Sequence, residues 1–293
     1  MNGIVIIDKP AGWTSQDVTA RLRRVFGTRR IGHGGTLDPM ATGVLPVFVG
    51  RGTRGVEFFE HAEKTYETEL LLGVATDTED TTGTVLTRRE VSVTPGQLTA
   101  VLERFRGEIM QIPPMYSALK VNGQKLCDLA RKGRQVERQP RPVTIHELTL
   151  LSREGDTLRL RVRCSKGTYI RTLLEDIAAA MGQKGTMSAL RRTTAGVYTE
   201  ADAHTLEEIQ TAKDAGPEAL QALMLPVESV FESLPLLVVE PRVEQHLYNG
   251  CPTSRYPAAD GRYRVRNVEG QFLGLANITG GVLKVEKLFV ERN

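Results

Sequence analysis

The sequence contains little cysteine, which excludes two classes of small-domain scaffold. Its three cysteines are an odd number at unrelated spacings, and no Cys-x-x-Cys pair occurs. A disulfide framework needs paired cysteines and a zinc knuckle needs closely spaced ligands, so we expect neither. So few cysteines fit a reducing compartment, and we expect a cytoplasmic protein.

Long apolar runs are absent as well. The longest, such as 44–49 and 234–239, contain a proline and fall far short of the roughly 18 residues that a membrane helix needs. The first ten residues lack the basic segment of a signal peptide, and we expect no contact with a membrane. What remains, 40% hydrophobic and 25% charged residues in a chain of 293, favours a globular protein of about two domains.

The net charge of +3 conceals strong local differences. Residues 100–147 hold nine basic and five acidic residues, and residues 157–196 hold eight basic and two acidic ones. Residues 197–240, in contrast, hold one basic and nine acidic residues. Basic segments favour a polyanionic partner, and nucleic acid is the commonest large polyanion.

Hydrophobic periodicity predicts a mixture of strands and helices. We expect strands at 3–7, 44–50, 64–73, 143–151 and 157–164, and helices at 15–26, 94–105, 169–181 and 204–225, with Ser15 as the N-cap of the first helix and a loop over 28–43. Proline-rich, basic residues 108–142 resemble an inserted lobe, and short strands and turns dominate from about residue 234. We therefore expect a domain over 1–230, with the insertion inside it, and a small module over 231–293.

The glycine-rich segment 32–43 holds the most distinctive polar residue. Pro39 forces Asp38 out of the helical region, so its carboxylate lies on an extended loop among basic segments. Such a carboxylate is suited to act as a nucleophile or base beside a polyanion, although an Asp-Pro turn would give the same pattern. His33 is a weaker candidate, because a single histidine is more often a satisfied polar residue.

Segment 165–171 lies where a basic strand meets a helix. Backbone N–H groups at a helix start attract anions. Tyr169 and Arg171 are two residues apart and leave the helix start in different directions. Arg171 would pair with a carboxylate from another loop, with a solvated arginine as the alternative. In the preceding strand, alternation places Arg159, Arg161 and Arg163 on one sheet face, where they would grip phosphates.

Two motifs have simpler explanations. Gly50–Gly55 matches G-x-G-x-x-G, but the next strand follows too soon for a βαβ unit, so a dinucleotide site is a remote alternative. The acidic segment Asp77–Gly83 lacks the spacing of a calcium loop and predicts a turn.

Taken together, the motifs resemble those of the bacterial tRNA pseudouridine-55 synthases. The resemblance covers nearly the whole chain and rests on residues 8–10, 32–43, 64–66, 73–80, 113–120, 165–171 and 190–192. It implies an α+β fold: a mixed, largely antiparallel sheet flanked by helices, with an inserted thumb and a small C-terminal all-β RNA-binding module of the PUA type. It also implies isomerisation of uridine 55 in the tRNA T-loop, with no cofactor and no metal.

The resemblance assigns roles to seven residues. Asp38 matches the essential aspartate, Arg171 its partner and Tyr169 a neighbour in the pocket. Tyr66 matches the aromatic residue that stacks on the uracil, and His33 the histidine that fills space in the T-loop. Lys9 matches the lysine before the first proline, and Leu190 an apolar pocket wall.

The chemistry suits these residue types, and it leaves alternatives open. A guanidinium favours the charged carboxylate, and a base inside a stack must be flipped out before it can react. Asp38 would either attack C1′ or remove the C2′ proton. A non-catalytic tRNA-binding or folding factor fits the charge pattern equally. A guide-RNA-dependent synthase, which would need protein partners, shares the aspartate loop. We expect tRNA as the partner, with no obligate protein partner, and a monomer.

Overall fold

The computed structural model describes residues 1–117, 119–121 and 123–290. The predicted insertion includes residues 118 and 122, and the predicted module includes 291–293, which lie outside the described residues. Strands β1–β9 are Gly3–Lys9, Ile31–His33, Thr42–Val49, Lys64–Leu72, Val74–Thr76, Val85–Arg88, Gly107–Gln111, Lys120–Val121 and Gln124–Lys125. Strands β10–β17 are Arg141–Glu154, Thr157–Cys164, Gly185–Ala195, Tyr198–Thr199, Leu236–Val239, Gly261–Asn267, Phe272–Thr279 and Val282–Leu288. Helices α1–α8 are Ser15–Phe26, Val56–Phe59, Pro95–Arg104, Leu126–Arg131, Ile170–Ala180, Leu206–Ala215, Pro217–Ala222 and Pro241–Tyr248, and the 3₁₀ helices η1–η3 are Gly50–Gly55, Glu200–Asp202 and Val227–Phe231.

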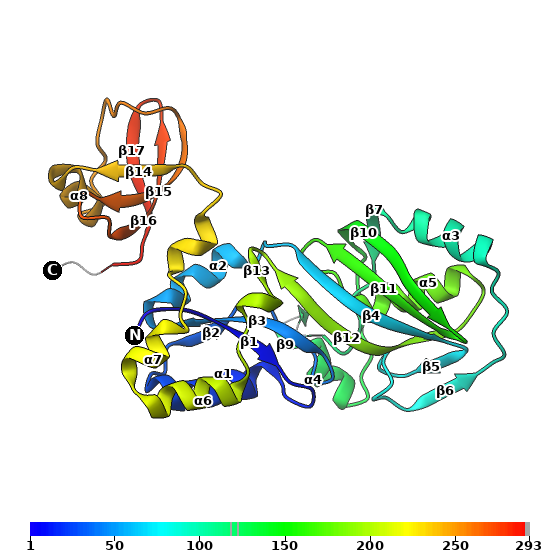
Figure 1. The fold of residues 1–293 in the computed structure, drawn as a ribbon. Helices are drawn as coiled ribbons and strands as arrows, with labels where there is room; N and C mark the ends of the chain where they lie inside the picture. Colours follow the sequence, from blue (N-terminus) through cyan, green and yellow to red (C-terminus); the bar gives the residue numbers. More distant parts are fainter. Residues whose placement is uncertain (118, 122, 291–293) are drawn as a thin grey trace.

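A mixed sheet forms the body of the molecule, as the sequence predicts. Its strand order is β1-β3-β12-β4-β11-β10-β7, with β2 beside β3 and β13 beside β12. All its pairs are antiparallel except β3 with β12. Helices α1, α6 and α7 lie beside β1 and β3, and α3 and α5 lie at the opposite end of the body (Figure 1). Among the described residues, none of the helices combines the length and apolar character that crossing a bilayer requires.

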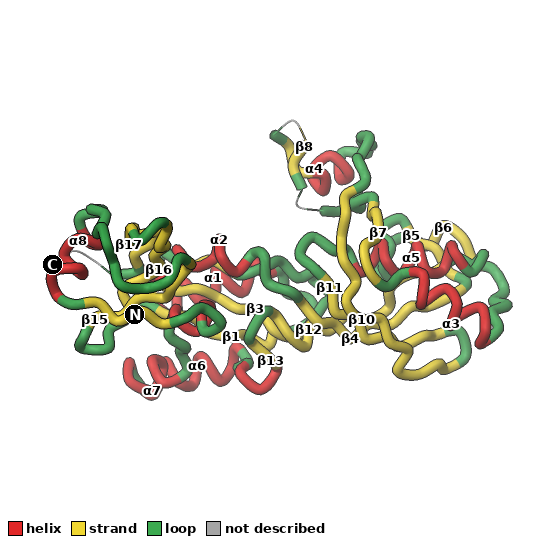
Figure 2. Tube along the Cα trace, turned by 90° about the horizontal axis from the view of Figure 1, so that it is seen from above, coloured by secondary structure: helices red, strands yellow, loops and turns green. Residues whose placement is uncertain are grey.

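The inserted lobe in the structure is shorter than the predicted range 108–142. Residues 108–111 belong to β7, which pairs with the start of β10 at Arg141 and Pro142, so both ends of the predicted insertion lie in the main sheet. Residues 108–111 mix polar and apolar side chains, and this pattern gave no signal for a strand at the edge of the sheet. The part that carries β8 and α4 projects from the body as a separate lobe (Figure 2).

The N-cap of the first helix lies one residue earlier than predicted. Thr14, and not Ser15, is the N-cap, because the Thr14 hydroxyl accepts from the Asp17 N–H while the Asp17 carboxylate accepts from the Thr14 N–H. Ser15 is freed for a tertiary contact. The predicted loop 28–43 is also partly wrong, because Ile31–His33 forms β2 against β3.

The C-terminal module is a four-stranded sheet with α8, and it packs on the body through aromatic rings. Phe231 of η3 lies 5.4 Å from Phe58 and 5.7 Å from Phe289, centroid to centroid, and Phe272 of β16 closes the cluster. Next to it, the buried Glu228 carboxylate accepts from the guanidinium groups of two β15 residues, Arg264 and Arg266. Aromatic packing and a paired buried charge therefore fix the module to the body.

Gly43 closes the parallel junction between β3 and β12. Its φ of +99° is strained for any other residue, and a Cβ there would lie 2.2 Å from the Arg192 carbonyl oxygen. The absence of a side chain at this position lets the two strands meet directly behind the Asp38 loop.

We predict that Gly43→Ala lowers the free energy of unfolding by about 2–5 kcal/mol, through backbone strain and the clash with Arg192. Gly96→Ala is the control, because a Cβ at Gly96 of α3 meets no atom within 4 Å. It should leave stability unchanged or raise it by up to about 1 kcal/mol. Urea unfolding followed by circular dichroism measures both, and equal losses in the two variants would contradict the account.

Candidate active site

Asp38 lies on the loop between β2 and β3, and the residue before it is anchored to α1. The Leu37 N–H donates to the Ser15 hydroxyl at 2.9 Å, and this hydroxyl donates back to the Leu37 carbonyl at 3.2 Å. Both residues are buried. The Asp38 backbone is therefore fixed from inside, while its side chain stays about one-third exposed, at 34%.

Lys9 anchors the residue after Asp38. Its fully buried ammonium donates to the carbonyls of Pro10, Trp13 and Pro39 at 2.9, 2.6 and 3.2 Å. Burial lowers the pKa of Lys9 to about 8, although the charge of Asp38 opposes this change. All three N–H donors of the Lys9 ammonium bind backbone carbonyls, so the side chain positions the backbone next to Asp38.

Arg171, the second residue of α5, binds Asp38 through both carboxylate oxygens. Its Nε donates to Asp38 Oδ2 at 2.9 Å, and its Nη2 donates to Oδ1 at 3.3 Å. The Arg171 side chain is only 5% exposed. A buried fork that meets both oxygens fixes the plane of the carboxylate, which a single bond would leave free to rotate.

The other donors of Arg171 bring two further segments to the site. Its Nη1 donates to the Thr78 carbonyl and its Nη2 to the Tyr116 carbonyl, both at 2.9 Å. Asp80, in the same turn as Thr78, places Oδ2 3.9 Å from Arg171 Nε. Segment 77–83 forms a turn, as the sequence predicts. Its contact with Arg171 was not predicted.

Tyr169 is the N-cap residue of α5, and a residue that sequence reasoning missed holds it. The side-chain amide of Gln111 accepts from the Tyr169 N–H at 2.8 Å and donates to its carbonyl at 3.0 Å. Burial raises the pKa of the Tyr169 hydroxyl, and the Ser117 hydroxyl opposes this rise from nearby, without hydrogen-bond geometry. The polar pattern of β7 gave no signal that Gln111 is buried.

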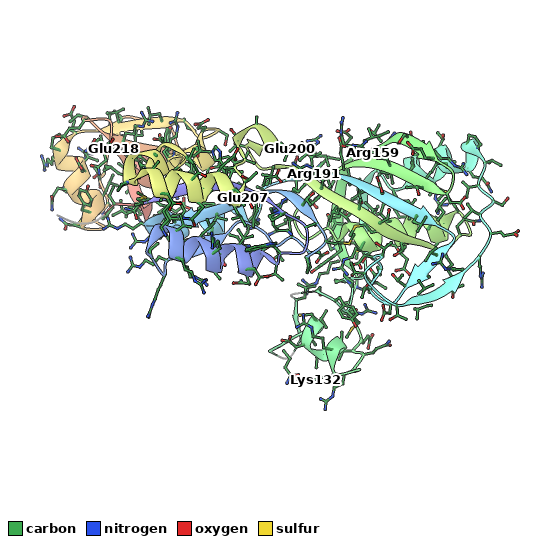
Figure 3. The ribbon with its side chains drawn as sticks, turned by 60° about the horizontal axis from the view of Figure 1, so that its bottom comes forward. Lys132, Arg159, Arg191, Glu200, Glu207 and Glu218 are labelled. Carbon is green, nitrogen blue, oxygen red and sulfur yellow. The ribbon has the colours of Figure 1, made fainter. Side chains whose placement is uncertain are left out.

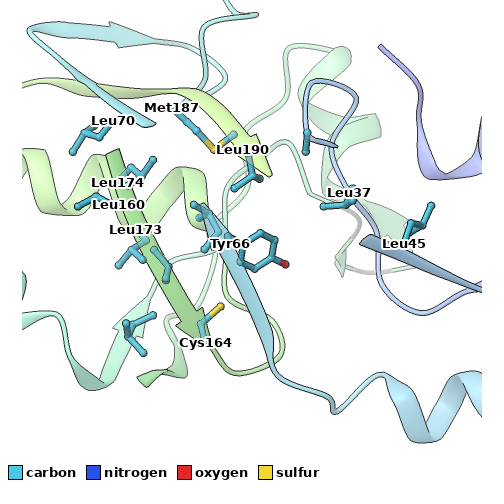
Figure 4. Packing of buried hydrophobic residues seen from close by; sticks show 14 of the residues in the cluster. Leu37, Leu45, Tyr66, Leu70, Leu160, Cys164, Leu173, Leu174, Met187 and Leu190 are labelled. Carbon is cyan, nitrogen blue, oxygen red and sulfur yellow. The ribbon is translucent and has the colours of Figure 1, made fainter. Parts of the chain in front are cut away.

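Tyr66 and Leu190 form the apolar side of the site. They lie on neighbouring strands, β4 and β12, and both are 8% exposed. The Tyr66 ring points from β4 toward the loop that carries Leu37, with Leu190 close to it (Figure 4). Burial raises the pKa of the Tyr66 hydroxyl, so this side of the pocket carries no negative charge at neutral pH.

His33 and Arg192 complete the site. Arg192 is buried and donates to the carbonyls of Val44 and Gly35 at 2.7 and 3.1 Å. Burial first, and the charge of Arg192 second, lower the pKa of His33, so His33 is neutral at pH 7. Its Nδ1 is buried without a hydrogen-bond partner. Alternation along β12 places Arg192 on the same sheet face as Leu190, and this pattern could have identified Arg192 as a site residue.

The three arginines that the sequence predicts as a phosphate grip lie on the sheet face that points away from Tyr66. Strand register places Val162 opposite Tyr66, so Arg159, Arg161 and Arg163 face the other side of the sheet. Arg159 and Arg161 pair with Glu67 at 2.6 and 3.0 Å, and Arg163 pairs with Glu63 at 2.9 Å. These two carboxylates offset part of the charge of the three arginines. The prediction placed the three arginines correctly on one face, but their ion pairs and their position away from Tyr66 do not favour a grip on phosphates.

The structure gives no support to a dinucleotide site. Residues Gly50–Gly55 form η1, and α2 leads directly into β4, which is not paired with β3. Among the described residues, no group of three or more His, Cys, Asp or Glu side chains is arranged to hold a metal ion.

The fold resembles that of chains in solved Cbf5 complexes. The chain superposes with a TM-score of 0.76 on a chain of the crystal structure titled as a Cbf5-Nop10-Gar1 complex, at 26% identity, covering 99% of this chain and 85% of that one. A chain of an archaeal box H/ACA sRNP Nop10-Cbf5 complex matches with a TM-score of 0.74 at 25% identity, covering 99% of this chain and 87% of that one. The chain therefore shares its overall architecture with a chain of each of these two complexes.

Sequence comparisons define the family. Residues 23–170 match the model of the TruB family pseudouridylate synthase N-terminal domain, and residues 171–232 match that of the tRNA pseudouridylate synthase B C-terminal domain. tRNA pseudouridine synthase B of Stutzerimonas stutzeri is 45% identical over 282 residues, 95% of this chain and 92% of that one. The Ralstonia pickettii protein of the same name is 43% identical over 303 residues, 98% and 94% of the two chains. The chain belongs to the TruB family of tRNA pseudouridine synthases.

Glu79 is a partly buried carboxyl group beside the site. It adopts a φ of +65°, and its Oε2 accepts from the hydroxyl of Thr172, the residue after Arg171, at 2.6 Å. Burial raises the pKa of Glu79 to about 7; Thr172, Arg171 and Arg138 oppose the rise, and Glu175 adds to it. The folded protein thus binds a proton here more tightly than the unfolded chain does.

We predict that this group makes the protein less stable as the pH rises. The pKa of Glu79 is higher in the folded protein than in the unfolded chain. The group therefore contributes stability that is fully present below the unfolded pKa of about 4.5 and is lost as the pH rises through the folded pKa of about 7. Glu79→Gln removes the titration, so it should be more stable than wild type by about 1–3 kcal/mol at pH 8 and about equally stable at pH 4. Urea unfolding at the two pH values tests this. A difference that does not depend on pH would contradict it.

Proposed function

We propose that this chain isomerises uridine 55 in the T-loop of tRNA to pseudouridine, with Asp38 as the reacting group. We further propose that it acts in the cytoplasm as a monomer, without a cofactor or an obligate protein partner. The observation that carries the proposal is the bidentate contact of buried Arg171 with the partly exposed carboxylate of Asp38. This contact holds an ionised carboxylate at the protein surface in one orientation, which the chemistry needs.

The reaction breaks the N1–C1′ bond of uridine, rotates the uracil and forms a C5–C1′ bond; the proton on C5 leaves and N1 takes up a proton, so that the product is an isomer of the substrate. In one route, Asp38 attacks C1′ as the N1–C1′ bond breaks, and C5 then displaces the carboxylate. In the other, Asp38 removes the C2′ proton to give a glycal as the uracil leaves, and the proton returns to C2′ when the C5–C1′ bond forms. Two carboxylate oxygens offer about four lone-pair positions, so bonds to Arg171 leave others for the substrate. Because both routes begin from an ionised Asp38, the arrangement supports either.

The substrate nucleotide must leave its stack to reach Asp38. Tyr66 offers an aromatic face for the flipped uracil, Leu190 an apolar wall and Tyr169 a polar neighbour. Neutral His33 is suited to fill the gap left by the flipped base, because an uncharged ring enters a stack without losing the hydration of a charge.

The lobe and the PUA-like module would bind the parts of the RNA that lie outside the pocket. Lys132 lies on the lobe, which projects from the body, whereas Glu207 and Glu218 lie on α6 and α7, away from it (Figure 3). We assign the catalytic domain to residues 1–230, the thumb to the part of 108–142 that projects, and the module to 231–293. The thumb then supplies positive charge to phosphates beside the reacting loop.

Two other functions share part of this support. The likeness to chains of structures titled as a Cbf5-Nop10-Gar1 complex and as a box H/ACA sRNP Nop10-Cbf5 complex favours a synthase that works only within a larger particle. A tRNA-folding factor would use the same surfaces without chemistry. Activity of the isolated chain on tRNA separates our proposal from both.

We predict that the purified chain releases about one tritium per molecule of unmodified tRNA labelled at C5 of uridine, and that Asp38→Asn releases none. The variant should bind tRNA within a few-fold of wild type, because the amide is isosteric with the carboxylate. Mapping of the modified position should locate it at residue 55.

Three outcomes would contradict the proposal in different ways. Release at another position would change the site of action. Absence of release with tight binding by both proteins would favour a folding factor or a missing guide particle. Loss of tRNA binding in Asp38→Asn would make Asp38 structural.

We also predict that the thumb, and not the arginine face of the sheet, contacts phosphates. Lys132→Ala combined with Arg134→Ala, both at exposed positions, should weaken tRNA binding about tenfold and reduce the salt slope of the affinity by about two. Arg159→Ala combined with Arg161→Ala removes the same charge and should change neither value. Filter binding at four salt concentrations is the measurement. The reverse ranking would move the RNA to the other sheet face.

A further inference from the structure

Trp13 is the single tryptophan of the chain, and it is exposed. Its relative exposure is 37%, and of the aromatic residues that the structure describes it alone falls in the exposed class. About a third of this large amphipathic side chain is therefore open to a ligand.

The backbone of Trp13 is held rigidly beside the reacting loop. Lys9 Nζ donates both to the Trp13 carbonyl, at 2.6 Å, and to the Pro39 carbonyl, at 3.2 Å, so one ammonium joins Trp13 to the residue after Asp38. On one side of Trp13, the Gly12 N–H also donates to the Pro39 carbonyl at 2.8 Å. On the other side, Thr14 is fixed as the N-cap of α1. The segment therefore presents the indole without a loss of loop entropy on binding.

An exposed indole on a backbone held beside the Asp38 loop, where we propose that a nucleotide is flipped out, has a nucleobase as its evident ligand. Flipping leaves the neighbouring bases of the RNA without a stacking partner, and every base has a π-face that an indole can cover. A protein partner would more often be recognised by a contiguous apolar patch. Here the residues around Trp13, namely 11–12, 14 and 16, are small or polar.

We propose that Trp13 is a nucleobase-binding residue, whose indole stacks on a base of the RNA next to the flipped-out uridine. The inference rests on the proposed function, because it takes the RNA around the reacting nucleotide as the ligand. It predicts that Trp13 contributes to affinity and not to the chemical step.

The single tryptophan makes the test direct. Tryptophan fluorescence of Asp38→Asn, which binds without turnover, is titrated with an unmodified T-arm stem-loop RNA. We expect saturable quenching with the same dissociation constant that filter binding gives. Trp13→Ala should weaken binding about tenfold to a hundredfold, raise KM and keep kcat within threefold, whereas Trp13→Phe should stay within threefold of wild-type affinity.

Leu151→Ala is the control, because Leu151 is also 37% exposed but lies near the far end of β10. It should bind RNA like wild type, and thermal unfolding checks that every variant is folded. Unchanged fluorescence in the complex, or wild-type affinity of Trp13→Ala, would overturn the inference. Quenching by RNA without tritium release from wild type would instead overturn the proposed function and leave the base contact standing.

Discussion

The contact between Asp38 and Arg171 is the interaction on which the rest of the site depends. The two residues are 133 positions apart in sequence, one on the loop before β3 and the other at the start of α5. An arginine that is 5% exposed is costly to bury unless its donors find partners, and the four hydrogen bonds of Arg171 go to a carboxylate and two backbone carbonyls. The same guanidinium thus orients the reacting group and joins three segments of the chain around it.

The surrounding structure serves to bring these segments together. The parallel junction of β3 and β12 places the Asp38 loop beside Arg192, and Gly43 permits the close approach. Buried cations then hold the loop from below: Lys9 donates to the Pro39 carbonyl and Arg192 to that of Gly35. Both contacts end on backbone carbonyls, so they fix the path of the chain and leave the carboxylate of Asp38 to Arg171 and the substrate.

Much of this could be predicted from the sequence, and the rest required the register of the sheet. Local signals were sufficient for β1, β3, β4, β10 and β11, for α3 and α5, and for the loop that carries Asp38, because each depends on neighbouring residues, but they did not predict β2, β7 or β12. The face of Arg159, Arg161 and Arg163 depends on which residue lies opposite Tyr66, and no local pattern gives this. The burial of Arg192 and Gln111 depends on distant carbonyl and amide partners. Polar residues with a tertiary role look like surface residues until their partners are placed.

The resemblance to a family supplied the seven candidate residues, and the structure gathers them around one loop. It also separates them by what they can do. Lys9 is enclosed and holds backbone, Tyr66 and Leu190 offer apolar surface, and Asp38 alone combines a charge with access to solvent. This division follows from burial and hydrogen bonding, and it is the reason that we propose Asp38 for the chemical step.

The most direct test of this account is single-turnover isomerisation of tRNA by Arg171→Lys, which keeps the positive charge but lacks the two-pronged contact. If the orientation of Asp38 is what matters, the rate of the chemical step should fall by about a hundredfold or more, while tRNA binds within a few-fold of wild type. A rate close to that of wild type would show that the carboxylate needs no such support, and it would contradict the central claim.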